Sequence, residues 1–452
     1  MKKLLSFLCI AVLAASSAYA GFEKDGFSAG FAFRMRGAME TVTEGTDADT
    51  QAYNRYTDIR VRPSFGYKVN NMVSAKLTFE VGDVTFGVDK DKLGRSSGGG
   101  YMADGVNVET KHAYIDIKPN KNHSFRAGLQ PYLDKHSLIF DEDLAGIKWD
   151  GKFDKVNTSL AWFVTEDNGE ENIDEATYSF GNDIILAELG YTVNKDMKIG
   201  LTNIIQMTKT EATIEGEEKS AEIPDTNLDE MGIWIAPHFQ GDFGKFDIGA
   251  VFAYNMRSAE FDKVKDNELN KDLEDPDDQS GMAFSLKANI KPDKKLNIGL
   301  NFLYTSGDED GKDYYKDISH FYGNGLEILS GGCAIDRTTH GWDGTIFSDK
   351  GTMLPVATVD YKVNKNFTIG GAFGMAMTLE DVKYGEESDT NLGMEFDVKA
   401  KVKMCDAINV TPFAAFFMPG DAFAYQNGQV DEKGDALTDM QIKIGFNLGY
   451  SF

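Results

Sequence analysis

Strict alternation of apolar and polar residues is the feature that most constrains how this chain can fold. The clearest case is the last stretch, QIKIGFNLGYSF (441–452). When apolar and polar residues alternate, a β-strand carries its apolar residues on one face and its polar residues on the other. The apolar face must be buried, either in a soluble β-sandwich or against lipid. A membrane strand needs about 9 to 11 residues, and this stretch keeps its alternation over that length.

The same alternation recurs along the whole chain, and connections of two kinds follow one another between the alternating segments. Clear segments are 27–35, 59–67, 75–81, 185–193, 246–254, 296–304 and 392–400. Short turns rich in Asn, Asp, Gly or Pro are predicted at 69–71, 118–122, 150–155, 194–196, 240–244, 291–295, 364–366 and 404–406. Longer connections are predicted at 40–52, 82–105, 131–144, 166–183, 208–229, 256–280, 306–352, 379–391 and 418–436.

Turns and loops that alternate by length are typical of an outer-membrane barrel, with its short turns in the periplasm and its long loops outside. The pattern predicts an all-β fold, a transmembrane antiparallel β-barrel of 18 strands, or 16 if one hairpin is misread. Closure of the barrel explains how the chain can end with an apolar strand, because the last strand pairs with the first and its apolar face contacts lipid. We therefore expect a protein of the Gram-negative outer membrane.

The first 20 residues have the pattern of a secretory signal peptide. Two lysines precede an apolar run, and Ala18-Tyr19-Ala20 is a small-x-small cleavage site. Residues 21–452 would then form the barrel, with the long loop 306–352 as its largest insertion. No later run reaches the 18 or so apolar residues of a spanning helix.

The formal net charge of −26 argues against nucleic-acid binding, which needs a basic face. Acidic loops could instead collect divalent cations. DEDGKD (308–313) is similar to half a calcium loop, but its twelfth position is Ser319 where an EF-hand has Glu. A solvated loop is the simpler interpretation, with calcium in the acidic loops as the alternative. No cofactor and no metal site are otherwise expected.

Enzymatic function finds no support in the motifs. The six histidines are scattered without an H-E-x-x-H pattern, and no G-x-S-x-G motif occurs. Asp134, His136 and Ser137 could be imagined as a hydrolytic set, but neighbours in sequence rarely form one. We expect no catalytic residues.

Residues that alternate with the apolar ones should face the barrel interior. Six basic residues of early strands are predicted to form one basic wall: Arg34, Arg36, Arg60, Arg62, Lys76 and Arg126. The stretch PYLDKHSLIFDEDLAG (131–146) follows them. If it folds inward, its acidic residues would oppose the arginines at a constriction: Asp134, Asp141, Glu142 and Asp143. In the alternative, the arginines pair with wall acids such as Asp58 and Glu80, and the loop points outward.

Five motifs together resemble the homotrimeric porins of anaerobic, sulfate-reducer-type Gram-negative bacteria. They are FEVGDVTFG (79–87), VETKHAYIDI (108–117), RAGLQPY (126–132), DLAGIKW (143–149) and SLAWFV (159–164). The resemblance implies a trimer with a water-filled pore, narrowed against a basic wall by the connection after the fifth strand, here 131–144. The chain lacks the Pro-Glu-Phe-Gly-Gly motif of enterobacterial general porins.

The resemblance implies a porin for passive diffusion of small hydrophilic solutes and ions. One alternative is a substrate-selective channel for anionic solutes or oligosaccharides, and another is a surface-structural barrel or adhesin. Tyr450 and Phe452 resemble the C-terminal signal of the outer-membrane assembly machinery, a further expected partner besides membrane lipid. The loop 306–352 is expected either to fold inward as a second gate or to pack on a neighbouring subunit.

Overall fold

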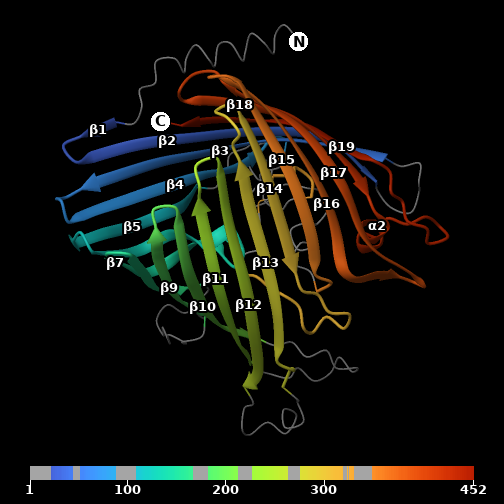
Figure 1. Ribbon diagram of the computed structural model, residues 1–452, viewed down its shortest axis with the longest axis horizontal. Coiled ribbons are helices and arrows are strands. Elements are labelled where there is room, and N and C mark those ends of the chain that lie inside the picture. Colours follow the sequence, from blue (N-terminus) through green and yellow to red (C-terminus); the bar gives the residue numbers. More distant parts are fainter. Residues whose placement is uncertain are drawn as a thin grey trace.

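The computed structural model describes residues 22–43, 51–87, 108–165, 182–211, 227–262, 275–318, 323, 325–329 and 349–451. The predicted signal peptide (1–20), Phe452 and much of the loop 306–352 lie outside these ranges. The described strands follow one another around a barrel in sequence order, and the first and last strands of the ring lie side by side (Figure 1).

The ring is a closed antiparallel barrel of 18 strands, as predicted, in which β19 pairs with β2. Its first half contains β2 (Phe27–Thr43), β3 (Gln51–Lys68), β4 (Val73–Thr85), β5 (Val108–Asn120), β6 (His123–Leu133), β7 (Asp141–Phe153), β8 (Val156–Val164), β9 (Asp183–Asn194) and β10 (Met197–Glu211). Its second half contains β11 (Asn227–Asp242), β12 (Phe246–Asp262), β13 (Gln279–Ile290), β14 (Leu296–Thr305), β15 (Thr352–Asn364), β16 (Phe367–Tyr384), β17 (Glu387–Lys403), β18 (Ile408–Pro419) and β19 (Gln441–Ser451). The short β1 (Phe22–Lys24) pairs with the start of β2.

The short turns lie where the sequence predicts them, and their polar residues explain why. In the β3–β4 turn, the Asn70 side chain accepts the backbone N–H groups of Met72 and Val73 at 2.7 and 2.9 Å. Such bonds replace the strand ladder at a reversal. Each turn therefore ends one strand and begins the next within a few residues.

One predicted loop is wrong. The connection at 379–391 is mostly strand, because β16 and β17 continue to a tight reversal at Gly385 and Glu386. Gly385 has φ of 62°, which suits a two-residue hairpin. The acidic residues of this stretch occupy positions in an extended hairpin, where a charged side chain can still reach solvent.

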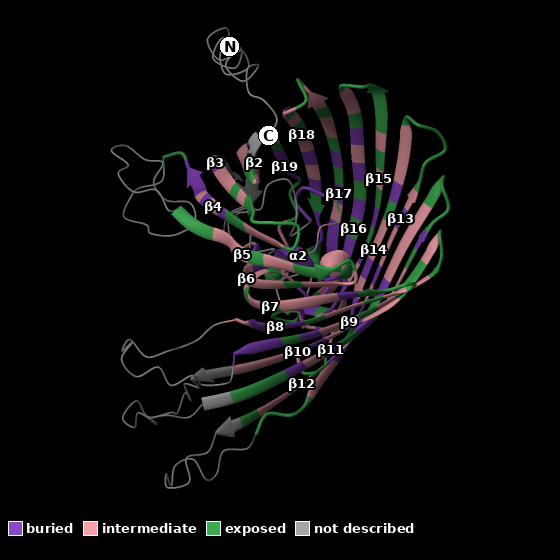
Figure 2. Ribbon diagram, turned by 90° about the vertical axis from the view of Figure 1, so that its left-hand side faces the viewer, coloured by how far each residue is buried: buried purple, intermediate pink, exposed green. Residues whose placement is uncertain are grey.

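The outer face of the barrel is apolar along successive strands. On β8, Leu160 and Trp162 are 50% and 44% exposed, whereas Ala161 and Phe163, which alternate with them, are 6% and 0% exposed. Figure 2 shows the same alternation of buried and less buried residues along strands such as β16. Contiguous exposed apolar surface of this extent is unfavourable in water and expected in lipid. Among the helices of the described residues, none is long and apolar enough to cross a membrane.

Three segments turn into the barrel and pack on one side of its inner wall. They are the connection 134–140, which contains the 3-10 turn η1 (Lys135–Ser137), the described parts of 306–329, and α2 (Asp421–Gln426). Their apolar residues share one cluster with inward residues of β8 to β18; the cluster includes Leu138, Ile139, Phe140, Tyr315, Leu326, Leu329, Phe423, Phe163, Leu186 and Trp234. The wall here contributes apolar side chains that pack against the apolar side chains of the inward segments.

Candidate functional site

Four arginines on β2 and β3 face the barrel interior, because they alternate with outward residues such as Phe33 and Met35. The most buried is Arg36, whose Nε and Nη2 donate to Asp58 at 3.1 and 2.9 Å. The two side chains are 1% and 0% exposed. A bidentate pair of this kind is geometrically specific and strong.

A β-bulge brings a further carboxylate to these arginines. The β3–β4 register changes from Ile59↔Val84 to Val61↔Val81, so β4 carries one extra residue. Gly82 lies there with φ of 149°, a conformation that a residue with a side chain rarely adopts. Asp83 consequently turns inward and accepts Arg60 Nε and Nη2 at 2.8 and 2.5 Å and Arg34 Nη2 at 2.7 Å.

Sequence reasoning missed Asp83, because strict alternation places Glu80 and Asp83 on opposite faces. The glycine inside the strand was the available signal, since such glycines often mark bulges. Glu80 also faces inward, pairing with Arg60 at 3.2 Å and with Arg62.

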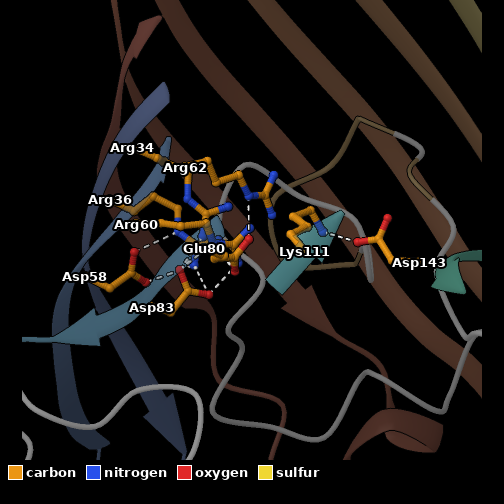
Figure 3. A network of polar contacts seen from close by, with 9 residues as sticks. All are labelled: Arg34, Arg36, Asp58, Arg60, Arg62, Glu80, Asp83, Lys111 and Asp143. Carbon is orange, nitrogen blue, oxygen red and sulfur yellow. Dashed lines mark hydrogen bonds and ion pairs between the residues drawn. The ribbon is translucent and has the colours of Figure 1, made fainter. Parts of the chain in front are cut away.

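We call these seven residues the arginine network: Arg34, Arg36, Arg60, Arg62, Asp58, Glu80 and Asp83 (Figure 3). Its arginines pair with wall acids such as Asp58 and Glu80, as one of the two alternatives expected. The other part of that alternative, a loop that points outward, is wrong, because residues 134–140 turn into the barrel. Four cations face three carboxylates, and the Arg34 and Arg62 side chains remain 23% and 33% exposed. The network therefore presents a small excess of positive charge to solvent inside the barrel.

The other two residues of the predicted basic wall lie nearer the short turns. Arg126 on β6 pairs with Asp116 at 2.8 Å, and its guanidinium lies 4.1 Å from the centre of the Tyr114 ring. Lys76 on β4 is exposed. That all six basic residues line one pore stays a prediction.

The four acidic residues predicted at the constriction have separate local partners. Asp143 pairs with Lys111 and, at 3.0 Å, with His112, as Figure 3 shows in part. Asp141 accepts the Ser137 hydroxyl at 3.1 Å, and Glu142 lies opposite Tyr132 in the β6–β7 ladder. Their action as a constriction opposite the arginines also stays a prediction.

Asp134 holds the turn that follows β6. Its side chain is buried and accepts the backbone N–H groups of Leu138, Ile139 and Phe140 at 3.3, 2.9 and 2.7 Å. Burial raises the pKa of Asp134 to about 7, although these donors act in the opposite direction. The carboxylate is thus engaged within its own turn.

The crossing segment, residues 134–140, spans from β6 and β7 to the far wall. His136 Nδ1 lies 2.9 Å from the Ser285 hydroxyl of β13, within hydrogen-bonding distance. The Tyr315 hydroxyl donates to the Leu138 carbonyl at 2.9 Å, and the Ile318 N–H donates to the Ile139 carbonyl at 2.8 Å. Because His136 and Ser137 have φ of 69° and 52°, the segment holds two non-glycine residues in a conformation that costs energy. The contacts with Ser285, Tyr315 and Ile318 help to hold this conformation.

A second inward stretch, the anchored segment (325–329), is held by two carboxylates of β17. Glu395 accepts the N–H groups of Glu327, Ile328 and Leu329 at 2.8, 2.8 and 2.5 Å. Asp397 accepts the Glu327 N–H at 3.0 Å. The anchored segment and the crossing segment therefore both occupy part of the barrel interior.

Other predicted features fall partly outside the described residues. Tyr450 lies on β19 with its ring centre 6.2 Å from that of Phe31, whereas Phe452 is not described, so the assembly signal stays a prediction. Within the described ranges, no group of three or more His, Cys, Asp or Glu side chains could hold a metal ion. Much of the acidic loop sequence is not described, and calcium there stays a prediction.

No protein-family model and no curated protein matches this chain. Among solved structures, OccK11 (OpdR) of Pseudomonas aeruginosa is similar with a TM-score of 0.50 and 9% identity, over 96% of this chain and 97% of that one. The outer membrane channel DcaP of Acinetobacter baumannii has a TM-score of 0.44 and 13% identity, over 96% and 100%. An anion-selective porin from Comamonas acidovorans has a TM-score of 0.46 and 12% identity, over 94% and 100%. The similarity to OccK11 shows a shared barrel fold, and the resemblance to sulfate-reducer-type porins stays a prediction.

Proposed function

We propose that this protein is an outer-membrane porin that lets small hydrophilic solutes and ions diffuse down their gradients. The observation that carries the proposal is the contrast between the two faces of the barrel. Leu160 and Trp162 expose apolar surface outward, whereas Arg34 and Arg62 keep charged, partly exposed side chains inside. A lipid-facing outside and a wet, charged inside are what a water-filled channel requires. The protein acts as a channel and performs no catalysis.

Several partners follow from this proposal. The short turns face the periplasm and the long loops face outward, with lipid around the barrel. The protein is exported through a signal peptide, is inserted by the outer-membrane assembly machinery through its last strand, and forms a homotrimer. The apolar outer face and the β19–β2 closure support membrane insertion, and the trimer rests on the sequence resemblance.

A substrate-selective channel for anionic solutes is the second candidate. The observation in its favour is that the crossing and anchored segments occupy part of the interior. This narrows the passage, and in a narrow passage each solute contacts the wall. The small positive excess of the arginine network would then favour anions.

Single-channel conductance of the purified protein in planar bilayers tests the proposal. A diffusion porin gives steps that scale with salt concentration, and trimers give them in threes. The sign of the reversal potential under a salt gradient reports ion preference. Small conductance that a particular anion blocks would support the selective channel. A silent protein would refute both and favour the surface-structural barrel.

A further inference from the structure

A cavity of about 510 Å³, lined by both polar and apolar residues, lies inside the barrel between the crossing segment and the short-turn ends of β7 to β11. This part of the wall is separate from β2, β3 and β4, which carry the arginine network. Its lining includes Lys135 of the crossing segment, Asn157, Glu188, Lys198, His238 and Gln240. Cavities of this size are in the range that holds a small organic solute.

Two lysines of this cavity have no counter-charge of their own. Lys135 and Lys198 are exposed, and no described residue forms an ion pair with either. The cavity's third lysine differs, because Lys148 pairs with Asp150 at 3.0 Å. The two unpaired ammonium groups are therefore available to an anion in the cavity.

The carboxylates of the lining do not cancel this charge. Asp134 is engaged with the backbone of its own turn. Glu188 accepts the Tyr132 hydroxyl at 3.0 Å and remains a single negative group against two free ammonium groups. Positive charge also acts on His136 of the crossing segment. Its pKa is lowered to about 4, first by burial and then by Lys287 and Lys135.

Neutral hydrogen-bonding groups make up most of the remaining polar lining. The side chains of Asn157 and Gln240 can each donate and accept, and His238 adds an imidazole. The Ser159 hydroxyl already donates to Asp150 at 2.6 Å, so its oxygen can serve as an acceptor. Such groups suit hydroxyls, whereas ammonium groups suit a carboxylate. A ligand with one carboxylate and several hydroxyls would use both halves of this chemistry.

We propose that this cavity is a binding site for small hydroxylated carboxylates of the sugar-acid class, which pause there during passage through the barrel. Lys135 and Lys198 bind the carboxylate, and the amide and hydroxyl side chains of β8 and β11 bind the hydroxyls. Glu188 discriminates against ligands with more negative charge. This proposal depends on the proposed porin function in one respect: the ligand must reach the cavity through the lumen.

The test measures how potassium gluconate, added at constant KCl, blocks single-channel current of the full-length protein in planar bilayers. Potassium acetate carries the charge without the hydroxyls, and glucose carries hydroxyls without the charge. Gluconate is expected to block at a lower concentration than either. Equal block by glucose or acetate would overturn the proposal, because one half of the chemistry would then suffice.

Variants locate the site. Lys198→Gln and Lys135→Gln should each raise the half-blocking gluconate concentration about tenfold, the usual scale for losing one charged hydrogen bond. Glu188→Gln should lower it, since the amide still accepts from Tyr132 while the repulsion is gone. Lys195→Gln is the matched control, because Lys195 lies in the β9–β10 turn with an 89% exposed side chain. If Lys198→Gln and Lys195→Gln behave alike, the site is not in this cavity.

Failure of this site and failure of the porin proposal give different results. KCl conductance without gluconate block would refute the site and leave the porin. If the protein does not conduct at all, calorimetric titration of gluconate into the detergent-solubilised protein and its Lys198→Gln and Lys135→Gln variants decides the site alone. Heat-modifiable gel mobility confirms that each variant is folded, and Lys135→Gln, on an exposed residue, carries the test if Lys198→Gln does not fold.

Discussion

Arg36 and Asp58 face each other across β2 and β3 with both side chains almost completely removed from solvent, at Nε–Oδ1 3.1 Å and Nη2–Oδ2 2.9 Å. Two charges buried together cost desolvation that their attraction and hydrogen bonds must offset. Removing Asp58 takes both of these hydrogen bonds from the buried Arg36 and leaves it the longer ion pair with Asp83, at 3.6 Å. The pair is thus a sensitive point of the inner wall.

Asp58→Ala is expected to lower the free energy of unfolding by about 3 to 5 kcal/mol, the usual cost of breaking a buried ion pair. Urea unfolding followed by tryptophan fluorescence in detergent measures it. Asp406→Ala is the matched control: Asp406 pairs with Lys403 at 2.8 Å in an exposed turn, and its loss should have no measurable effect. Equal effects of the two variants would contradict the role of burial.

Position 134 should tolerate substitution by an amide side chain but not by an alkyl side chain. Asp134→Asn keeps an oxygen for the N–H groups of Ile139 and Phe140, whereas Asp134→Ala leaves three buried donors without an acceptor at about 1 to 3 kcal/mol each. We expect fast amide exchange in 138–140 in the alanine variant and near-normal protection in the asparagine variant. Hydrogen exchange read by mass spectrometry distinguishes them, and near-normal protection in the alanine variant would exclude the capping role.

His136 should make the protein less stable in mild acid. Its pKa is about 4 in the folded protein against an ordinary value of 6.5, because burial and nearby lysines disfavour the charged ring. As pH falls from about 6.5 to about 4, the unfolded chain takes up a proton that the folded state refuses, so stability falls in this window. The raised pKa of Asp134 acts in the opposite direction over this window, in both proteins. His136→Gln cannot titrate, so its urea midpoint should exceed that of the unchanged protein by a growing amount as pH falls. Parallel curves for the two proteins would rule the histidine out.

Glu395 and Asp397 should differ in how firmly they hold the anchored segment. Glu395→Ala removes the carboxylate that accepts the N–H groups of Ile328 and Leu329, whereas Asp397→Ala leaves all three donors with Glu395. We therefore expect larger single-channel conductance in Glu395→Ala and a near-normal value in Asp397→Ala. Unchanged conductance in Glu395→Ala would mean that the anchored segment does not limit the passage.

The order and positions of the strands could be predicted because each strand has a local sequence pattern. Alternation identifies the strands, Asn and Asp identify turns such as that at Asn70, and the apolar final strand indicates closure onto β2. The interior could not be predicted in the same way. Asp83 turns inward only because of the bulge at Gly82, and the crossing segment is fixed by Ser285, which lies 149 positions from His136. The bulge has only the glycine inside the strand as a local signal, and no local pattern encodes the contact of the crossing segment with Ser285.

The apolar side of the interior also has a consequence for the size of the passage. Six inward alanines lie fully buried in the cluster that seats the inward segments: Ala236, Ala253, Ala283, Ala372, Ala376 and Ala415. Close-packed interiors do not absorb an added side-chain volume without displacement. A leucine at one of these positions would push the inward segments toward the arginine network. The bore of this barrel is therefore set in part by methyl groups that no diffusing molecule touches.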